Sequence, residues 1–233
     1  MKLLALDTAS GLCSAALQVD GQLLLRETST SREHAQLLLP MVQSLLTEAG
    51  LTLVQLDAIA FGRGPGSFTG LRVAAALTQG LAYGADLPVL PVSDLRALAQ
   101  RAAQLSPADA PLLACMDARM QELYWALFEP GAPGAVVADA PEQLCTPALL
   151  TARLGPAAAV SRQWRGAGMG LAVWQASADA PPLDATRLLT TAEPSAREIA
   201  LLGAADWAAG RAQAPEAALP VYLRDDVAKP PAR

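Results

Sequence analysis

Short apolar segments separated by turn residues predict three β-strands at the start of the chain. They cover Lys2–Leu6, Cys13–Val19 and Gln22–Glu27. The Asp20-Gly21 pair between the second and third segments indicates a tight hairpin. We therefore expect an antiparallel meander at the N-terminus.

A helical period replaces this pattern after residue 30. Ser31 is a candidate N-cap and Gly50 ends the apolar pattern, so we expect a helix between them. Its stripe consists of Leu37, Leu38, Met41, Val42, Leu45, Leu46 and Ala49. Because Pro40 lies inside the stripe, we expect either a kink or a regular helix that begins there.

The most distinctive stretch is rich in glycine and covers residues 58–72. An apolar strand at Leu56–Phe61 runs into a turn, and a helix follows over Thr69–Tyr83. Ser67 or Thr69 is its N-cap, and Gly84 is its expected C-cap. The free amides of a helix start suit an anion, but the glycine spacing fits no phosphate loop, dinucleotide fingerprint or nucleophile elbow. A sharp turn that feeds a helix explains these glycines equally well.

A further strand over Pro88–Val92 and a helix from Ser93 to about Ala103 lead to a linker over residues 106–111. The N-terminal pattern then recurs. A shift of 110 residues places Leu3 on Leu113, Ala5 on Cys115, Leu6 on Met116, Asp7 on Asp117, Ala16 on Ala126 and Leu17 on Leu127. This repeat predicts two related halves.

The second half shows fewer clear elements. We expect a short helix from Thr146 to about Leu154, a glycine turn over Arg165–Gly170, and a helix from the capping residue Ser195 to about Gly210. The predicted domains are residues 1–106, with the partner-binding helices, and residues 107–213, followed by a tail over residues 214–233.

Composition limits the functions open to the chain. The formal net charge is −5 and the sequence pI is near 4.9, the wrong sign for a module that grips a nucleic-acid backbone by itself. Cys13, Cys115 and Cys145 lie far apart in apolar segments, as expected of buried thiols in a reducing compartment. His34 is the single histidine, which excludes metal sites built on several His ligands.

No apolar run approaches the roughly 20 residues that a membrane span requires. The chain enters a strand-like segment directly after Met1, so we expect no signal peptide. The cytoplasm is therefore the expected location, without membrane attachment.

Two hairpins, each a strand, an Asp, a turn and a second strand, resemble the layout of the actin-like ATPase and sugar-kinase superfamily. The resemblance implies an α/β fold of two related actin-like (ribonuclease H-like) domains, each a mixed sheet flanked by helices. It implies that Asp7 and Asp117 stand where this superfamily holds phosphates, with Gly166–Gly170 as an adenosine-side turn. For both Asp residues, a strand-ending role through bonds to turn amides is the alternative.

Stretches from end to end of the chain resemble the TsaB family. They are Leu4-Ala5-Leu6-Asp7-Thr8-Ala9, Arg32-Glu33-His34 with Leu39-Pro40, the run from Gly62 to Arg72, Met116-Asp117-Ala118-Arg119-Met120 with Tyr124-Trp125-Ala126, and Pro220-Val221-Tyr222-Leu223-Arg224. The glycine-rich run and the Asp-Ala-Arg-Met segment are the most specific.

The resemblance implies a scaffold rather than an enzyme. TsaB-like subunits pair with TsaD through two helices of the first domain, and the pair recruits the ATPase TsaE. The complex transfers threonylcarbamoyl to the adenosine beside the tRNA anticodon. TsaD has a His-x-x-x-His metal pair where this chain has Asp94 and Leu98, and Leu98 cannot bind a metal. We therefore expect no catalytic residue and no metal site, with tRNA reached through the complex and a homodimer when TsaD is absent.

The resemblance also assigns a partner surface on the two helices. Its candidate residues are Leu38, Met41, Val42, Leu45, Leu71, Ala74, Ala75 and Thr78. A stripe of this kind serves an intramolecular core equally well.

Five residues are candidates for an anion or nucleotide contact: Asp7, Arg63, Arg72, Asp117 and Arg119. Solvated side chains, strand-end caps and partner salt bridges are the alternatives. The isolated chain is expected to need no cofactor, with ATP or ADP confined to the complex interface. Tyr222 and Arg224 either dock the third subunit or pack on their own chain.

An independent phosphotransferase of actin-like fold, acting on a small molecule, is the alternative function. No residue of the sequence stands out as its catalytic base. Nucleotide affinity of the isolated chain separates the two functions.

Overall fold

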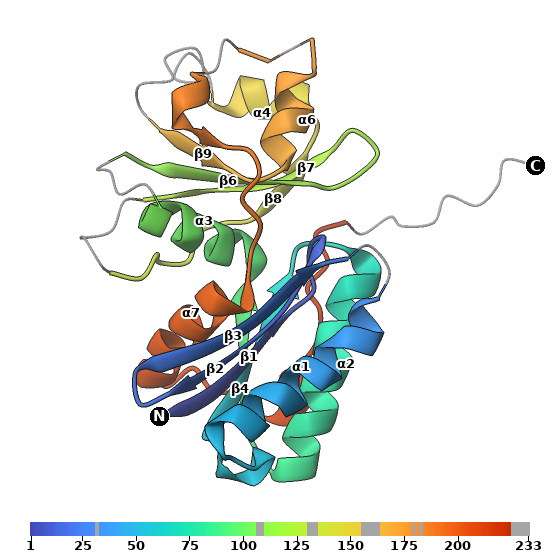
Figure 1. The fold of residues 1–233 in the computed structure, drawn as a ribbon. Coiled ribbons are helices and arrows are strands. Elements are labelled where there is room, and N and C mark those ends of the chain that lie inside the picture. The colour runs from blue at the N-terminus through green and yellow to red at the C-terminus, as the bar shows by residue number, and fades with distance from the viewer. Residues whose placement is uncertain are drawn as a thin grey trace, which may run out of the picture.

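The structure, a computed structural model, describes residues 1–30, 33–105, 110–129, 135–154, 164–178, 180–181 and 184–224. Two five-stranded sheets lie one above the other, with helices between them and on their outer faces (Figure 1). This arrangement confirms the expected α/β fold of two related actin-like domains, each with a mixed sheet.

The first sheet has the strand order β3-β2-β1-β4-β5. Its strands are β1 (Lys2–Asp7), β2 (Leu12–Val19), β3 (Gln22–Ser29), β4 (Ala58–Gly64) and β5 (Val89–Ser93). The predicted meander is confirmed, because β1, β2 and β3 pair antiparallel. Strands β4 and β5 extend the sheet in parallel with β1, which makes it mixed.

Helices cover both faces of this sheet. Helices α1 (His34–Ala49) and α2 (Phe68–Ala85) pack on one face, and α7 (Ala196–Ala208) packs on the other (Figure 1). Successive side chains of β1 point to opposite faces of the sheet, so the strand contributes to the packing on both faces. Leu4 and Leu6 join the cluster under α1 and α2, whereas Leu3 and Ala5 join the cluster under α7.

The second sheet has the order β10-β9-β6-β7-β8. Its strands are β6 (Leu112–Asp117), β7 (Leu123–Phe128), β8 (Gln143–Cys145), β9 (Arg165–Ala167) and β10 (Leu188–Leu189). Helix α3 (Asp94–Leu105) lies on its inner face, and α4 (Pro147–Leu154) and α6 (Gly170–Gln175) lie on its outer face. Short 3-10 helices, each of one turn, lie at η1 (Leu53–Gln55), η2 (Ala185–Arg187) and η3 (Pro215–Ala217).

The two sheets are related, but not by the uniform shift of 110 residues that the sequence predicts. Asp7 pairs with Ser14, whereas Asp117 pairs with Leu123, so the second hairpin turn is one residue shorter. The shift therefore places Ala16 and Leu17 one position away from their counterparts. The shift also matches residues that point to different faces of their sheets. In the first sheet the odd-numbered residues of β1, such as Ala5, point toward the central helices, whereas in β6 the even-numbered residues, such as Ala114, do so.

Several local expectations change in the folded chain. Helix α1 runs through Pro40 instead of starting there, and the expected cap Ser31 lies outside the described residues. Helix α2 is capped at its start by Ser67, as one alternative predicted, but ends at Ala85, two residues beyond Tyr83, with its C-cap Asp86 in the left-handed region. The Gly84 cap is therefore wrong.

Domain boundaries drawn on the sequence separate the sheets but not the helices. Helix α7 belongs to residues 107–213, yet it packs on the first sheet, and α3 belongs to residues 1–106, yet it packs on the second sheet. The two sequence segments thus exchange helices in the central layer. Within the described ranges, no helix combines the length and apolar character needed to cross a bilayer.

Candidate functional site: a helical face and the cleft beside it

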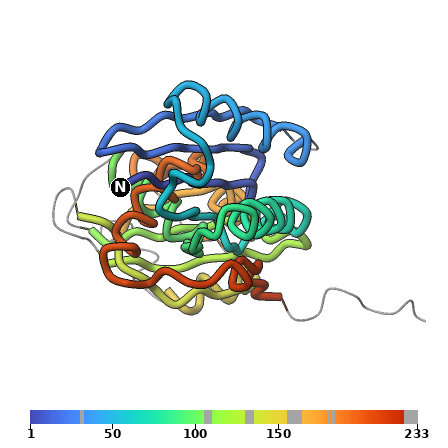
Figure 2. Tube along the Cα trace, turned by 90° about the horizontal axis from the view of Figure 1, so that it is seen from below, coloured from blue at the N-terminus to red at the C-terminus, as the bar shows by residue number. Residues whose placement is uncertain are grey.

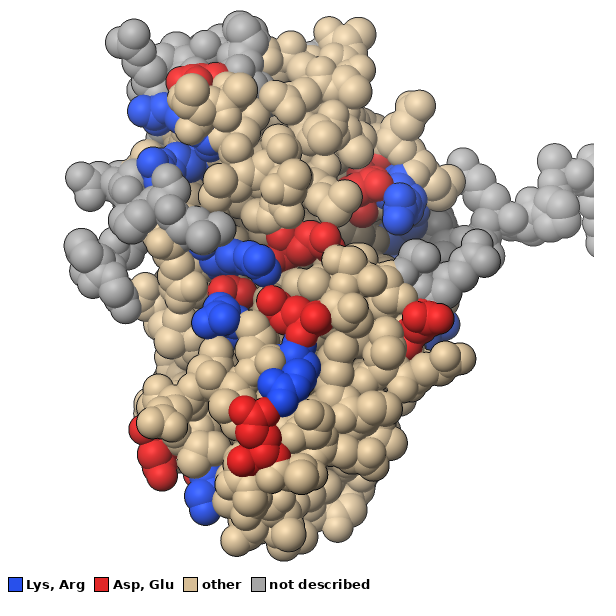
Figure 3. All heavy atoms as spheres, in the orientation of Figure 1, with Lys and Arg blue, Asp and Glu red and all other residues tan. Residues whose placement is uncertain are grey.

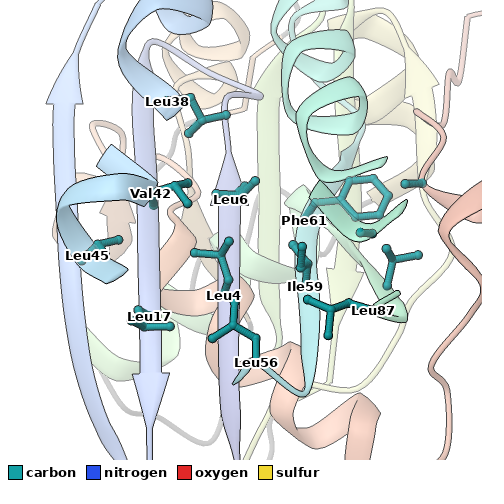
Figure 4. Packing of buried hydrophobic residues seen from close by; sticks show 14 of the residues in the cluster. Leu4, Leu6, Leu17, Leu38, Val42, Leu45, Leu56, Ile59, Phe61 and Leu87 are labelled. Carbon is teal, nitrogen blue, oxygen red and sulfur yellow. The ribbon is translucent and has the colours of Figure 1, made fainter. Parts of the chain in front are cut away.

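Most residues assigned to the partner surface point into the molecule. Leu38, Val42 and Leu45 are at most 1% exposed and contact the first sheet (Figure 4). Of the α2 candidates, Leu71, Ala74, Ala75 and Thr78 are also buried. Met41 is half-buried. The partner assignment is therefore wrong for the seven buried residues, because the apolar stripe that makes the helix periodic is the one that the sheet covers.

A different stripe of α2 faces solvent. Phe68, Arg72, Ala76, Gly80 and Gly84 are exposed and recur every four residues, so they form one ridge. Gly80 and Gly84 have open space where a Cβ would stand, which leaves the backbone approachable. Half-buried apolar side chains of both helices flank the ridge: Leu37, Met41, Val73, Leu77 and Leu81.

This face, which we call the α1/α2 face, carries almost no charge. Glu48 and Arg72 are the charged residues of the two helices. The surface over α1 and α2, at the lower right of Figure 3, is accordingly mostly uncharged. In the sequence, the ridge is recognisable only as the set of helix positions that the apolar stripe leaves over.

A cleft of about 660 Å³ lies at the edge of this face, between the two sheets. The turn after β1 (Ala9–Gly11), the start of α2 (Gly66–Thr69) and the β6–β7 turn line it, together with Met169 and Tyr222. Its volume lies in the range of small-molecule sites, roughly 300–1,000 Å³. Its walls are largely apolar and contain Met116, Met120 and Met169, none of which the sequence identified as a site residue.

The β6–β7 turn at the rim is strained. Arg119, Met120 and Gln121 all have φ between 53° and 62°, in the left-handed region. Asp117 stabilises the turn by accepting bonds from the Arg119 backbone (2.7 Å) and guanidinium (3.1 Å). Asp117 thus acts as the strand-end cap that was its alternative role, and Arg119 is its partner.

Asp7 does not reach the cleft. It is fully buried, and its Oδ1 accepts a bond from the Ala9 amide at 2.8 Å. The position matched to a phosphate-holding Asp therefore has no access to a ligand in this structure. The side chain instead faces Asp94, at the start of α3, across Gly62.

Asp7 and Asp94 form a buried carboxyl pair. Oδ2 of Asp94 accepts from the Gly64 amide at 2.5 Å, whereas Oδ2 of Asp7 and Oδ1 of Asp94 receive no amide or basic donor. Burial raises the pKa of Asp7 to about 6, and burial with the Asp7 charge raises the pKa of Asp94 well above its usual range. A protonated Asp94 that donates to Asp7 satisfies both groups. A Cβ on Gly62 would lie 2.4 Å and 2.7 Å from the two carboxyls, so glycine makes the contact possible.

The remaining two anion candidates lie elsewhere. Arg63 forms a bidentate pair with Glu142, at 3.0 Å and 3.2 Å, and is not among the residues that line the cleft. Arg72 lies on the exposed ridge of α2. The five candidates thus do not form one site, since only Asp117 and Arg119 line the cleft.

At the two positions matched to the metal pair of the resembled transferase, one side chain offers no metal ligand and the other is already hydrogen-bonded. Leu98 is fully buried in the core under α3, and Asp94 is engaged with Asp7 and Gly64. Across the described ranges, no group of three His, Cys, Asp or Glu residues could hold a metal.

The C-terminal segment joins the two parts of the molecule. The Val221 amide bonds to the Arg63 carbonyl at 2.6 Å, and Tyr222 packs against Phe68 with ring centroids 5.3 Å apart. Arg224 donates to the Ala118 carbonyl and to Glu122 in the β6–β7 turn. Tyr222 and Arg224 therefore pack on their own chain, one on each side of the cleft.

Known proteins are similar to this chain in sequence and in fold. The family model of TsaD, tRNA N6-adenosine threonylcarbamoyltransferase, matches residues 28–231. The tRNA threonylcarbamoyladenosine biosynthesis protein TsaB of Escherichia coli is 39% identical over 98% of this chain and 96% of its own. The Haemophilus influenzae TsaB is 50% identical over 54% of this chain and 52% of its own.

A solved structure agrees over nearly the whole length. YeaZ from Pseudomonas aeruginosa superposes with a TM-score of 0.83 at 41% identity, covering 95% of this chain and 99% of that one. Sequence and fold thus match along the same full span. The chain belongs to the TsaB family and takes part in the biosynthesis of threonylcarbamoyladenosine in tRNA.

Proposed function

We propose that this protein is a non-catalytic dimerisation subunit that binds TsaD through the α1/α2 face and helps to recruit TsaE. The observation that carries the proposal is the exposed ridge Ala76, Gly80 and Gly84, set in a nearly uncharged surface. Small residues let a second helix approach closely, and the half-buried apolar neighbours supply the area to be covered.

Similarity to the TsaD family model supports the choice of partner. Chains of one fold often pair through equivalent faces, because a two-fold arrangement makes each helix pair meet its counterpart. The same geometry accommodates a homodimer when TsaD is absent. In both cases α1 and α2 form a four-helix packing with the partner helices.

The rest of the proposal follows from charge and from the site. At a net charge of −5 the chain repels polyanions, so tRNA is bound by the complex rather than by this subunit alone. The subunit works without a cofactor of its own, and ATP or ADP binds at the complex interface.

The experiment is light scattering on size-exclusion peaks of the chain with TsaD from the same organism. We expect a heterodimer for the wild type and none for Ala76→Arg, whose side chain would separate the helices. Ala208→Arg, on the exposed end of α7, is the matched control and should bind normally. Binding by Ala76→Arg equal to that of the wild type would refute this face as the interface.

The alternative, a phosphotransferase acting in the 660 Å³ cleft, gives the opposite result. In that case the isolated wild-type chain hydrolyses or transfers phosphate from ATP, and no complex with TsaD forms. Measuring ATP turnover on the same fractions decides between the two functions.

A further inference from the structure

Arg72 is a charged side chain on the α1/α2 face that no carboxylate of the described chain neutralises. Glu48, the other charge on these helices, pairs with Arg26. Arg72 donates from Nε to the Tyr222 hydroxyl at 3.0 Å, and no other hydrogen bond or ion pair reaches it from the described residues. Among the described residues, its charge is thus without an ionic partner.

The guanidinium is nevertheless held in place. It lies 3.6 Å from the centroid of the Phe68 ring and 5.7 Å from that of Tyr222. The two rings remain 42% and 40% exposed, so they support the guanidinium without covering it. We call Phe68, Arg72 and Tyr222 the anchor patch.

The contacts of Arg72 leave a defined binding edge. Tyr222 occupies Nε and the rings occupy a face of the guanidinium plane, so the two terminal nitrogens remain. Their parallel N–H bonds match the two oxygens of a carboxylate. Fixing the group in advance reduces the entropy lost on binding.

The anchor patch is continuous with the proposed interface. Phe68 and Arg72 begin the same ridge that continues through Ala76 and Gly80. Tyr222 belongs to the C-terminal segment, which flanks α2 on the side away from α1 (Figure 2). A chain that covers the ridge also removes Arg72 from water, and an unpaired buried charge is costly.

We propose that the anchor patch is the electrostatic anchor of the interface: Arg72, stacked on Phe68 and bonded to Tyr222, binds an Asp or Glu carboxylate of the TsaD chain. This inference rests on the proposed function. A carboxylate fits better than a phosphate because the surrounding face is apolar and the chain carries a net charge of −5.

The test is the dissociation constant for TsaD, measured at two salt concentrations and both without and with ATP. Arg72→Met keeps most of the stem and removes the charge, so we expect about tenfold weaker binding or more, with a smaller salt dependence. Arg72→Lys retains the charge but not the paired N–H bonds and should fall between. Tyr222→Phe removes the hydroxyl that fixes Nε and should weaken binding by about two- to fourfold.

Controls separate anchoring from folding and from the proposed function. Arg197→Met changes an exposed arginine on α7 and should bind TsaD as the wild type does. All variants should unfold at the wild-type temperature. Self-association should not weaken, because Glu48 is the one carboxylate on the two helices of a second copy and is already paired.

Three results would overturn the inference. Wild-type affinity in Arg72→Met refutes the anchor while leaving the α1/α2 interface intact. A loss seen only when ATP is present assigns Arg72 to a phosphate instead. Equal weakening of self-association shows that Arg72 shapes the face rather than binding a carboxylate. Failure of the wild type to bind TsaD is distinct from these, since it refutes the proposed function and this inference together.

Discussion

At the scale of single residues, the buried pair of Asp7 and Asp94 departs furthest from ordinary solution chemistry. Both carboxyls are fully buried, and backbone amides of Ala9 and Gly64 satisfy one oxygen of each. Among charged neighbours, Glu193 raises the pKa of Asp7, and Arg63 lowers that of Asp94. The pair therefore favours holding a proton that the unfolded chain would release.

This proton makes stability fall as pH rises. The unfolded carboxyls lose protons near pH 4, whereas the pKa of folded Asp7 is about 6 and that of folded Asp94 is raised well above its usual range. Between these values the folded state binds more protons, so the free energy of unfolding decreases, by up to about 1.4 kcal/mol per pH unit for each group. Burial also raises the pKa of Glu198 to about 7, which adds to the same trend.

We expect Asp94→Asn to flatten this decline. Asn keeps an oxygen for the Gly64 amide and offers a permanent N–H donor to Asp7, so no proton needs to be shared. Urea unfolding at pH 5, 6.5 and 8 should show a variant that gains stability over the wild type as pH rises, by about 1–2 kcal/mol at pH 8. Parallel pH curves for the two proteins would contradict the shared proton.

The three thiols give a second prediction at this scale. Cys13, Cys115 and Cys145 are free and buried, as the sequence predicted. Burial raises the pKa of Cys13 to about 11 and raises those of Cys115 and Cys145. We expect a thiol reagent at pH 8 to label the native protein slowly and all three thiols rapidly in denaturant. Fast labelling of the native protein would show that the core opens readily.

At the scale of elements, α1 and α2 each have one side for the sheet and one for solvent. Leu38 and Leu39 illustrate the division, because they are neighbours with 0% and 39% exposure. The side chains that face the sheet hold each helix on the core, and those that face solvent are available to a partner.

We expect Leu38→Ala to destabilise the protein by about 2–5 kcal/mol, because it opens a cavity against Leu6 and Val42. Leu39→Ala removes the same atoms from a partly exposed side chain and should cost under about 1 kcal/mol. Thermal unfolding measures both. Equal losses would mean that the helix is not seated on the sheet as described.

At the scale of the whole molecule, ion pairs in the central layer connect segments that are distant in sequence. Arg96 of α3 is 4% exposed, donates to the Val137 carbonyl at 2.7 Å and pairs with Asp206 of α7 at 2.9 Å. Asp139 lies 3.4 Å from the same guanidinium. The chain around Val137 and Asp139 is thereby attached to α3 and α7, the two helices that lie between the sheets.

We expect Arg96→Met to lower the free energy of unfolding by about 3 kcal/mol, since it leaves Asp206 and the Val137 carbonyl short of a buried donor. Arg211, which also pairs with Asp206 at 3.0 Å, limits the loss. Arg197→Met, at an exposed site on α7, serves as the control for removing an arginine. An unchanged urea midpoint for Arg96→Met would show that the network contributes nothing to stability.

Predictions from the sequence were best where the signal is local. Strand and helix positions follow from the period of apolar residues, and caps such as Ser67 and Gly50 follow from backbone needs within one turn. The family motifs are likewise contiguous. The candidate site was predicted less well, because periodicity shows that a stripe is apolar but not whether the protein's own sheet or a partner covers it.

The sequence by itself determined the order of elements, the repeat of the hairpin and the family. Tertiary structure alone decided which side of α1 and α2 is free, that Asp7 meets Asp94 instead of a ligand, and that Arg72 meets Tyr222, 150 residues away. The physical reason is the distance along the chain over which each interaction acts. Hydrogen-bond period and turn chemistry act between neighbours in the chain, whereas the burial of a carboxyl or the stacking of an arginine depends on residues that only the packing of sheets and helices brings together.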